Sequence, residues 1–360
     1  MAQNTTITVL KTAICYGNKS DSLNLLCFPS AATFWGMSKK RMFNPVVLAA
    51  FAAIYLIWGS TYAAIRLVVT HLPPLTMGGV RFVVAGGLLL LVLRLRGQRL
   101  PRAKRLIGPA VTGALMLTGS HGIVGWSQQW VPSGMAAVIL ATGPLWIVLL
   151  GWLAFGGRRP SLAVAASLGL GLGGVWFIAA PSGGLPTFPA LLLAVAPVLW
   201  STGALFSTRL PRPDSTLMST ALQMLFGGGG LLALGLASGD LSLLDNLPTM
   251  ATPWLALAYL TIFGSLIALA TYQWLLREVG PAATSTHAFV NPVVALLIGG
   301  FALGEPLPAA AALGGAMVLA AVLLNLRDML RQERPAASAG ERSAPTARAP
   351  TCSCGPRPCR

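Results

Sequence analysis

The sequence predicts an all-α integral membrane protein of ten transmembrane helices, arranged as two inverted five-helix repeats. Three observations predict this class: apolar runs recur along most of the chain, charged residues are scarce, and the two halves share a residue pattern. Of the 360 residues, 55% are hydrophobic and only 9% are charged, whereas a soluble domain carries about 25% charged residues. A soluble core cannot absorb so many apolar runs, so we expect a lipid bilayer to surround the chain.

Ten apolar stretches approach the roughly 20 residues that a helix needs to cross the hydrocarbon of a bilayer. We predict spans at residues 46–67, 73–93, 106–126, 132–155, 161–180, 188–208, 215–237, 253–275, 280–303 and 307–326. They form a first repeat over residues 46–180 and a second over residues 188–326. Residues 1–45 are expected to be a disordered extension, with Met37 as an alternative true start, and residues 327–360 a disordered cytoplasmic tail.

Basic residues between the spans predict their orientation. Lys and Arg gather in alternate connections, beginning with Lys39, Lys40 and Arg41 before the first span. The intervening connections carry no Lys or Arg and include the acidic residues Asp240 and Glu305. By the positive-inside rule, both termini are expected in the cytoplasm. The same rule accounts for the net charge of +16, so nucleic acid is not an expected partner.

The repeat is visible as matching residues in the two halves. Trp58 is echoed by Trp200, Gly119-Ser120 by Gly264-Ser265, and Gly143-Pro144 by Asn291-Pro292, always in the same order. Each copy holds five spans, and an odd number makes the second copy enter the membrane from the opposite side. In an inverted-topology repeat, a site forms between the halves near the midplane, and rocking exposes it to each side in turn.

Polar groups inside the spans are the functional candidates, because each is costly in hydrocarbon unless it faces inward or is paired. Arg81 is a candidate fixed cation for an anionic group of the substrate; the alternative is a structural arginine held by backbone carbonyls. Its counterpart in the second repeat is the neutral Gln223. His121 and His287 titrate near neutral pH and are candidates for proton coupling, unless they are hydrogen-bonded packing residues.

Pro144 and Pro292 occupy matching places in the fourth and ninth spans, where a proline removes a backbone hydrogen bond and bends the helix. They are candidates for a gate or a cavity wall, with a static bend as the alternative. Gly227–Gly230 would allow close packing of helices. Trp58, Tyr62 and Trp200 could border a substrate cavity, and the alternative is that these aromatic side chains face lipid. The predicted substrate-binding residues are Trp58, Ser60, Thr61, Tyr62, Arg81, Trp200, Gln223 and Asn291.

The sequence offers no residue set for the chemistry of a soluble enzyme. It has no Walker loop for ATP, no metal-binding triad and no Ser/His/Asp order that a site within the membrane could use. The five cysteines lie outside the apolar runs and lack the spacing of a tetrahedral zinc site. We therefore predict no enzymatic activity, no metal and no cofactor.

Several motifs resemble EamA-type members of the drug/metabolite transporter superfamily over about residues 46–326. They are Ile57-Trp-Gly-Ser-Thr-Tyr62, Gly79-Val-Arg-Phe82, Val131-Pro-Ser-Gly134, Val290-Asn-Pro-Val293 and Gly304-Glu305. The resemblance implies two EamA repeats around a cavity open to one side at a time, and export of small metabolites, amino acids or drugs. One departure is that the first repeat has Gly156-Gly157-Arg158 where many members have a Gly-Glu pair.

The predicted function is a secondary-active exporter of a small molecule in the cytoplasmic (inner) membrane of a bacterium. The alternatives are a flippase for a lipid-linked substrate and a non-transporting membrane scaffold or sensor. A homodimer is an open alternative to a monomer. The sequence leaves the cargo and the coupling ion undetermined.

Overall fold

The computed structural model describes residues 44–156, 159–179, 187–240, 248–305 and 309–332. These residues form helices joined by short turns, and no strand occurs among them. The all-α prediction is therefore confirmed. The predicted N-terminal extension and most of the predicted C-terminal tail lie outside the described residues.

The first repeat contains five helical segments, two of them divided. They are α3 (Pro45–Val69); α4 (Pro74–Leu95); η1 (Ala103–Leu106) with α5 (Ile107–Thr112), η2 (Gly113–His121) and α6 (Gly122–Ser127); α7 (Ser133–Leu140) with α8 (Gly143–Phe155); and α9 (Leu162–Ala179). The second repeat follows the same order. It comprises α10 (Thr187–Leu193) with α11 (Ala196–Ser207); α12 (Thr216–Ala237); α13 (Thr252–Tyr259) with η5 (Leu260–Ile267) and α14 (Ala268–Glu278); α15 (Gly280–Thr284) with α16 (His287–Leu303); and α17 (Ala309–Gln332).

The helical segments correspond to the predicted spans. Within the part of the chain that the structure describes, seven segments are long and apolar enough to cross a membrane, and three shorter apolar helices lie within the fifth, ninth and tenth predicted spans. The predicted edges differ most at the end, because α17 continues to Gln332, beyond the predicted boundary at residue 326.

The repeat extends to local irregularities of the backbone. The third and eighth spans both contain a π-helical stretch, η2 and η5, in which Gly119-Ser120 and their counterparts Gly264-Ser265 lie. The matching helices α8 and α16 both end at a glycine in the left-handed region, Gly156 with φ 65° and Gly304 with φ 63°. A residue without Cβ adopts this conformation at little cost. The two copies therefore share their departures from regular helix.

Three spans are broken near the middle of the bundle. Breaks separate α7 from α8 and α10 from α11, and a proline follows each break closely, at Pro144 and Pro197. A proline has no N–H to donate to the preceding turn, so it favours such a break. Pro292 lies inside the continuous helix α16, and the break of that span falls earlier, between α15 and α16. The gating role of Pro144 and Pro292 stays a prediction.

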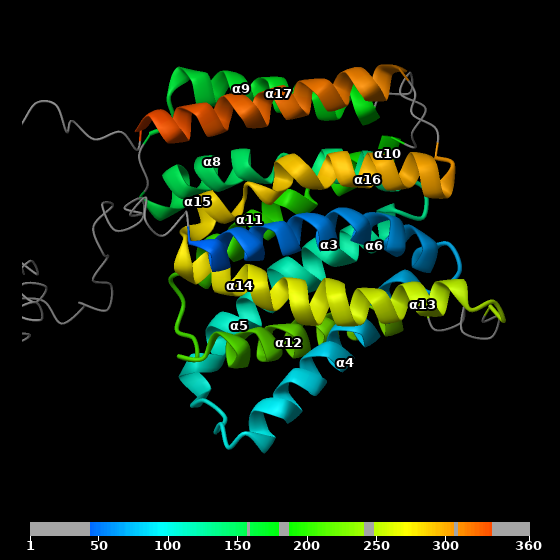
Figure 1. Ribbon diagram of the computed structural model, residues 1–360, viewed down its shortest axis with the longest axis vertical. Helices are drawn as coiled ribbons and strands as arrows, with labels where there is room; N and C mark the ends of the chain where they lie inside the picture. The colour runs from blue at the N-terminus through cyan, green and yellow to red at the C-terminus, as the bar shows by residue number, and fades with distance from the viewer. Residues whose placement is uncertain (1–43, 157–158, 180–186, 241–247, 306–308, 333–360) are drawn as a thin grey trace, which may run out of the picture.

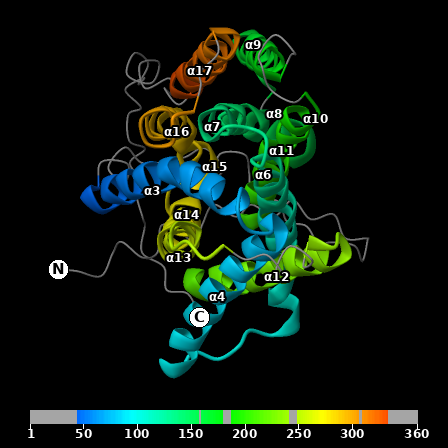
Figure 2. The same cartoon turned by 90° about the vertical axis from the view of Figure 1, so that its right-hand side faces the viewer.

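Helices α3, α9, α16 and α17 run in roughly the same direction in Figure 1, and α4 is inclined to them. Helices α9 and α17 pair at one side of the bundle and α4 and α12 at the other (Figures 1 and 2). Helices α3, α11, α14 and α16 lie between these pairs. The start of α3 and the end of α17 lie at the same end of the bundle, left in Figure 1. We call this end the termini edge and the opposite end the far edge.

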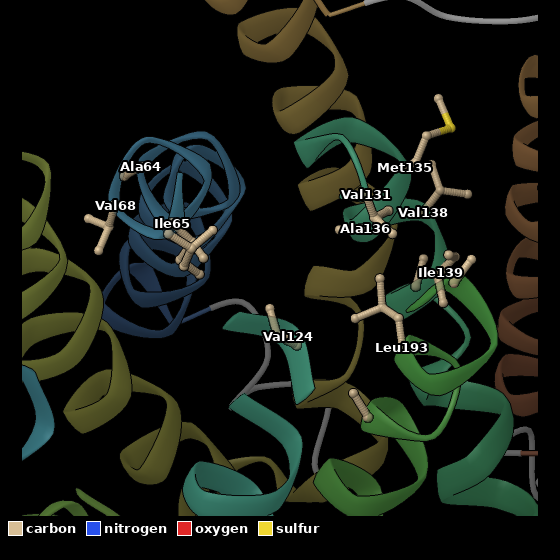
Figure 3. Close-up of a cluster of buried hydrophobic side chains, with 14 of the residues drawn as sticks. Ala64, Ile65, Val68, Val124, Val131, Met135, Ala136, Val138, Ile139 and Leu193 are labelled. Carbon is tan, nitrogen blue, oxygen red and sulfur yellow. The ribbon is translucent and has the colours of Figure 1, made fainter. Parts of the chain in front are cut away.

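Apolar side chains join the two repeats near the centre. Figure 3 shows Ile65 and Val68 of α3, Val124 of α6, Ile139 of α7 and Leu193 of α10, all members of one buried cluster. The first four belong to the first repeat and Leu193 to the second. Packing across the repeats therefore holds the central helices around the site described next.

Candidate functional site

A cavity between the repeats, which we call the main cavity, brings together most of the predicted site residues. It is bordered by α3, η2 and α6, α7 and α8 from the first repeat, and by α11, α14 and α16 from the second. The space not filled by protein atoms is about 700 Å³, counting the part that opens to solvent. Eight predicted residues line it: Trp58, Thr61, Tyr62, His121, Pro144, Trp200, His287 and Asn291.

Aromatic rings form one continuous wall of the main cavity. The Trp58 ring centroid lies 5.5 Å from that of Trp200 and 4.9 Å from that of Tyr272. It also lies 5.1 Å from the ring of His287. His121 extends the wall, with its ring centroid 5.4 Å from that of Trp200. These separations and tilted or edge-on geometries suit attraction between aromatic rings.

Hydrogen bonds hold the two tryptophans in place, one across the repeats and one within the second repeat. Trp58 Nε1 donates to the carbonyl of Gly264 at 3.2 Å, within the π-helical stretch η5. Trp200 Nε1 donates to Tyr272 Oη at 3.0 Å. A π-helical turn departs from the regular hydrogen-bond ladder and often marks a functional site. The repeat-related pair Trp58 and Trp200 therefore meet at one wall, as their matching positions suggested.

Apart from the two imidazoles, the polar groups on the described lining are uncharged. Among the described lining residues, none is Asp, Glu, Lys or Arg. Ser201 Oγ donates to the carbonyl of Gly143 at 3.0 Å, at the break between α7 and α8. Ser120 Oγ is fully buried and has no hydrogen-bond partner among the described residues. With its amide oriented to satisfy its neighbours, Asn291 donates to the carbonyls of Tyr55 and His287 at 3.2 Å and 3.1 Å.

Both candidate histidines are half-buried, lie against aromatic rings and bond to the backbone. His121 Nδ1 lies 3.2 Å from the carbonyl oxygen of Met116, and His287 Nδ1 lies 2.8 Å from that of Thr284. Since a carbonyl only accepts, Nδ1 is the protonated nitrogen in each ring. The other nitrogen, Nε2, is then the one that can take up a proton.

Four predicted residues lie outside the lining of the main cavity. Ser60 Oγ lies 2.6 Å from Tyr259 Oη and donates to the carbonyl of Ile57 at 2.8 Å. Gln223 accepts from Gln273 Nε2 at 2.7 Å, deep between helices. Pro292 lies within α16. Arg81 lines a neighbouring pocket instead.

Several lining residues were not predicted as site residues, among them Tyr272, Ser120 and Pro197. Tyr272 precedes Gln273, the counterpart of Gln128, but a tyrosine in a long apolar run carries no distinct signal. Ser120 was noted only as part of the repeat. Pro197 could have been found, because it is a proline inside a predicted span, which is the same signal that singled out Pro144.

Charged side chains bind the backbone at both edges of the bundle. At the far edge, Glu305 accepts from the backbone N–H of Ser133 at 3.0 Å, and Asp240 accepts from that of Thr76 at 2.7 Å. At the termini edge, Arg209 donates to the carbonyl of Phe155 at 2.6 Å, and Arg277 to that of Asp214 at 2.7 Å. Anions thus cap helix N-termini at one edge, and cations bind carbonyls at the other.

Comparisons with known proteins give a consistent result. The profile of the EamA-like transporter family matches residues 44–180 and 187–327. An Escherichia coli K12 protein described as the uncharacterized inner membrane transporter YedA is 38% identical over 299 residues, covering 82% of this chain and 95% of that protein.

Two further matches are more distant. A probable terminal-alkyne amino-acid exporter of Streptantibioticus cattleyicolor is 27% identical over 292 residues, covering 79% of this chain and 95% of that protein. One solved crystal structure superposes with a TM-score of 0.55 at 22% identity, covering 79% of this chain and 98% of the other. At that identity, the superposition supports the fold alone.

Proposed function

Because the chain belongs to the EamA-like transporter family of the drug/metabolite transporter superfamily, we propose that it is a secondary-active exporter of a small molecule. The cargo binds in the main cavity and reaches each side in turn as the repeats rock. The observation that carries this proposal is the meeting of Trp58 and Trp200, one from each repeat, on the wall of a cavity between the repeats.

The distribution of charge supports an orientation with the termini edge in the cytoplasm. Arg209 and Arg277 bind backbone carbonyls at that edge. Glu305 and Asp240 accept from backbone N–H groups at the far edge, where Arg66 also binds a carbonyl. Arginine and lysine are retained on the cytoplasmic side of membrane proteins. The Escherichia coli relative is named as an inner membrane transporter, which supports the cytoplasmic membrane as the proposed site of action.

Trp58→Ala tests the cargo site. Exported compounds are first compared between cells with and without the gene, and flux of the identified compound is then measured in vesicles. We expect Trp58→Ala to lower the flux at least about tenfold, which corresponds to ~1.4 kcal/mol in the barrier. Trp176→Ala is the matched control, because Trp176 lies on the peripheral helix α9 and is 60% exposed. Equal flux in both variants would refute the cargo site.

A second prediction concerns proton coupling by His121 and His287. The groups facing them are Arg81 for His121, and Tyr272 for His287. If Nε2 of these rings carries the coupled proton, the double variant His121→Gln/His287→Gln should lose the pH-dependent part of the flux. His71→Gln is the control, because His71 is exposed in the turn after α3. A double variant with an unchanged pH profile excludes the histidines as coupling groups.

A further inference from the structure

Arg81 is a buried cation whose contacts leave its charge unbalanced. It is only 5% exposed, in the middle of α4. Its Nε donates to Ser265 Oγ at 2.6 Å, and its guanidinium carbon lies 4.6 Å from the ring centroid of Phe82. Neither contact brings a negative charge. Among the described residues, no carboxylate forms an ion pair with Arg81.

The guanidinium borders an apolar space, which we call the second pocket. This pocket lies beside the main cavity and contains about 410 Å³ not filled by protein atoms, counting its open side. Besides Arg81, its lining includes His121, Met77, Gly125, Leu231 and Leu260, with no Asp or Glu among the described lining residues. His121 and Ile65 also line the main cavity, so they form the wall between the two spaces.

An arginine has five N–H donors in a planar fork that suits a carboxylate or another small anion. Only the Nε donor of Arg81 has a hydrogen-bond acceptor among the described residues. A buried charge without a counter-ion is strongly unfavourable, and more so within a membrane. The second pocket therefore has the charge, the spare donors and the space that an anion requires.

We propose that the second pocket is an anion-binding site in which Arg81 holds one small anionic group. The ligand is a halide-like free anion or the carboxylate of a molecule with an apolar body, because the remaining lining is almost wholly apolar. The Arg81 guanidinium offsets the cost of taking the anion out of water. The site is separate from the main cavity, and its occupancy does not depend on the proposed transport function.

Chloride binding to the purified full chain in detergent tests the proposal directly. Bound chloride broadens the ³⁵Cl magnetic resonance line, and a specific site gives a component that saturates with concentration. We expect this component in the wild type and its displacement by sodium hexanoate, but not by 1-hexanol, which lacks the charge. Saturable broadening without displacement identifies a free-anion site. Displacement by hexanoate identifies a site that also accepts carboxylates.

Substitutions test whether Arg81 is the residue that binds the chloride. Arg81→Gln should lower chloride affinity at least about tenfold, and Arg81→Lys should retain most of it. Arg66→Gln is the control, because Arg66 is the arginine of α3 that donates to the carbonyl of Gln128. Gly125→Val adds bulk at a residue that lines the pocket without removing charge, and its Cβ would make ordinary contacts of 3.7 Å and 3.9 Å with Pro74. It should also weaken binding.

Two results would overturn the site. One is a wild type that shows no saturable broadening and no carboxylate-dependent effect. The other is a saturable component that persists at the same affinity in both Arg81→Gln and Gly125→Val. Should Arg81→Gln fail to fold, Gly125→Val with Arg81→Lys decides the question alone, since neither variant removes the buried charge. Loss of transport in Trp58→Ala has no bearing on this measurement.

Discussion

Gly228→Ala is expected to separate α4 from α12 and to lower the free energy of unfolding by about 1–3 kcal/mol, as overpacking of a tight interface does. A Cβ at Gly228 would lie 2.9 Å from the backbone nitrogen of Val83 and 3.0 Å from the carbonyl oxygen of Gly79. Both obstacles are backbone atoms, so no side-chain rotation can relieve the contact. Close approach through small residues is a common means of helix association in membranes.

The neighbouring Gly229 provides the matched control. A Cβ at Gly229 would meet nothing within 4 Å, and alanine is intrinsically better than glycine within a helix by up to ~1 kcal/mol. Gly229→Ala should therefore leave stability unchanged or slightly higher. Thermal unfolding of the two purified variants in the same detergent measures the difference. Equal midpoints would show that the α4–α12 contact is not as tight as described.

The repeat predicts a second copy of the same contact. The counterpart of Gly228 is Gly86, and the counterpart of Gly79 is Ala221. A Cβ at Gly86 would lie 2.9 Å from the carbonyl oxygen of Ala221, as a Cβ at Gly228 meets that of Gly79. The same type of close contact therefore occurs at two places between α4 and α12, and the two-fold symmetry of the repeats relates them. Figures 1 and 2 show this pair at one side of the bundle.

Much of the architecture could be predicted from the sequence, because a chain in hydrocarbon must form long helices that make all their backbone hydrogen bonds internally. Apolar runs therefore place the spans, and the resemblance to EamA-type transporters is confirmed by the family match. The π-helical stretches η2 and η5 could not be predicted, since their residues read as ordinary apolar helix. The sequence showed only that Gly119-Ser120 and Gly264-Ser265 match between the repeats, and this match does not predict a π-helical backbone.

The site was predicted better on its aromatic side than on its polar side. Trp58 and Trp200 could be paired by the repeat, and the structure brings their rings together. Depth in a span, however, does not tell which way a side chain faces. Arg81 and Gln223 are deep and polar, yet Arg81 borders the second pocket and Gln223 is bonded to Gln273. Helix rotation and crossing decide this, and both depend on packing between spans distant in sequence.

Gly304-Glu305, the Gly-Glu pair that only the second repeat has, contributes a contact between the two repeats. Glu305 joins the segment after α16 to the start of α7, so it links the two repeats at the far edge. Its carboxylate accepts from the backbone nitrogen of Ser133 at 3.0 Å and from its Oγ at 2.7 Å. It also accepts from the backbone nitrogen of Gly134 at 3.4 Å. A carboxylate at a helix N-terminus gains from the helix dipole as well.

Glu305→Ala is expected to open the far edge. Hydrogen bonds to a charged group contribute about 1.5–3 kcal/mol, and a buried donor left without a partner costs a similar amount. Because Glu305 bridges the repeats, losing its hydrogen bonds destabilises the conformations in which the far edge is closed. Each ~1.4 kcal/mol shifts the balance of two conformations tenfold, so the population with an open far edge should rise at least about tenfold.

Thiol labelling measures that shift. With the native cysteines replaced, Thr61→Cys places a reactive group on the main cavity, and a membrane-impermeant reagent added from the far-edge side reports access. Labelling should be at least about tenfold faster with Glu305→Ala and intermediate with Glu305→Gln, whose amide oxygen can still accept. Asp214→Ala is the control, because its carboxylate lies at the termini edge and forms an exposed ion pair with Arg105, of little energetic weight. An unchanged rate in Glu305→Ala would mean that other contacts, such as that of Asp240 with Thr76, keep the far edge closed.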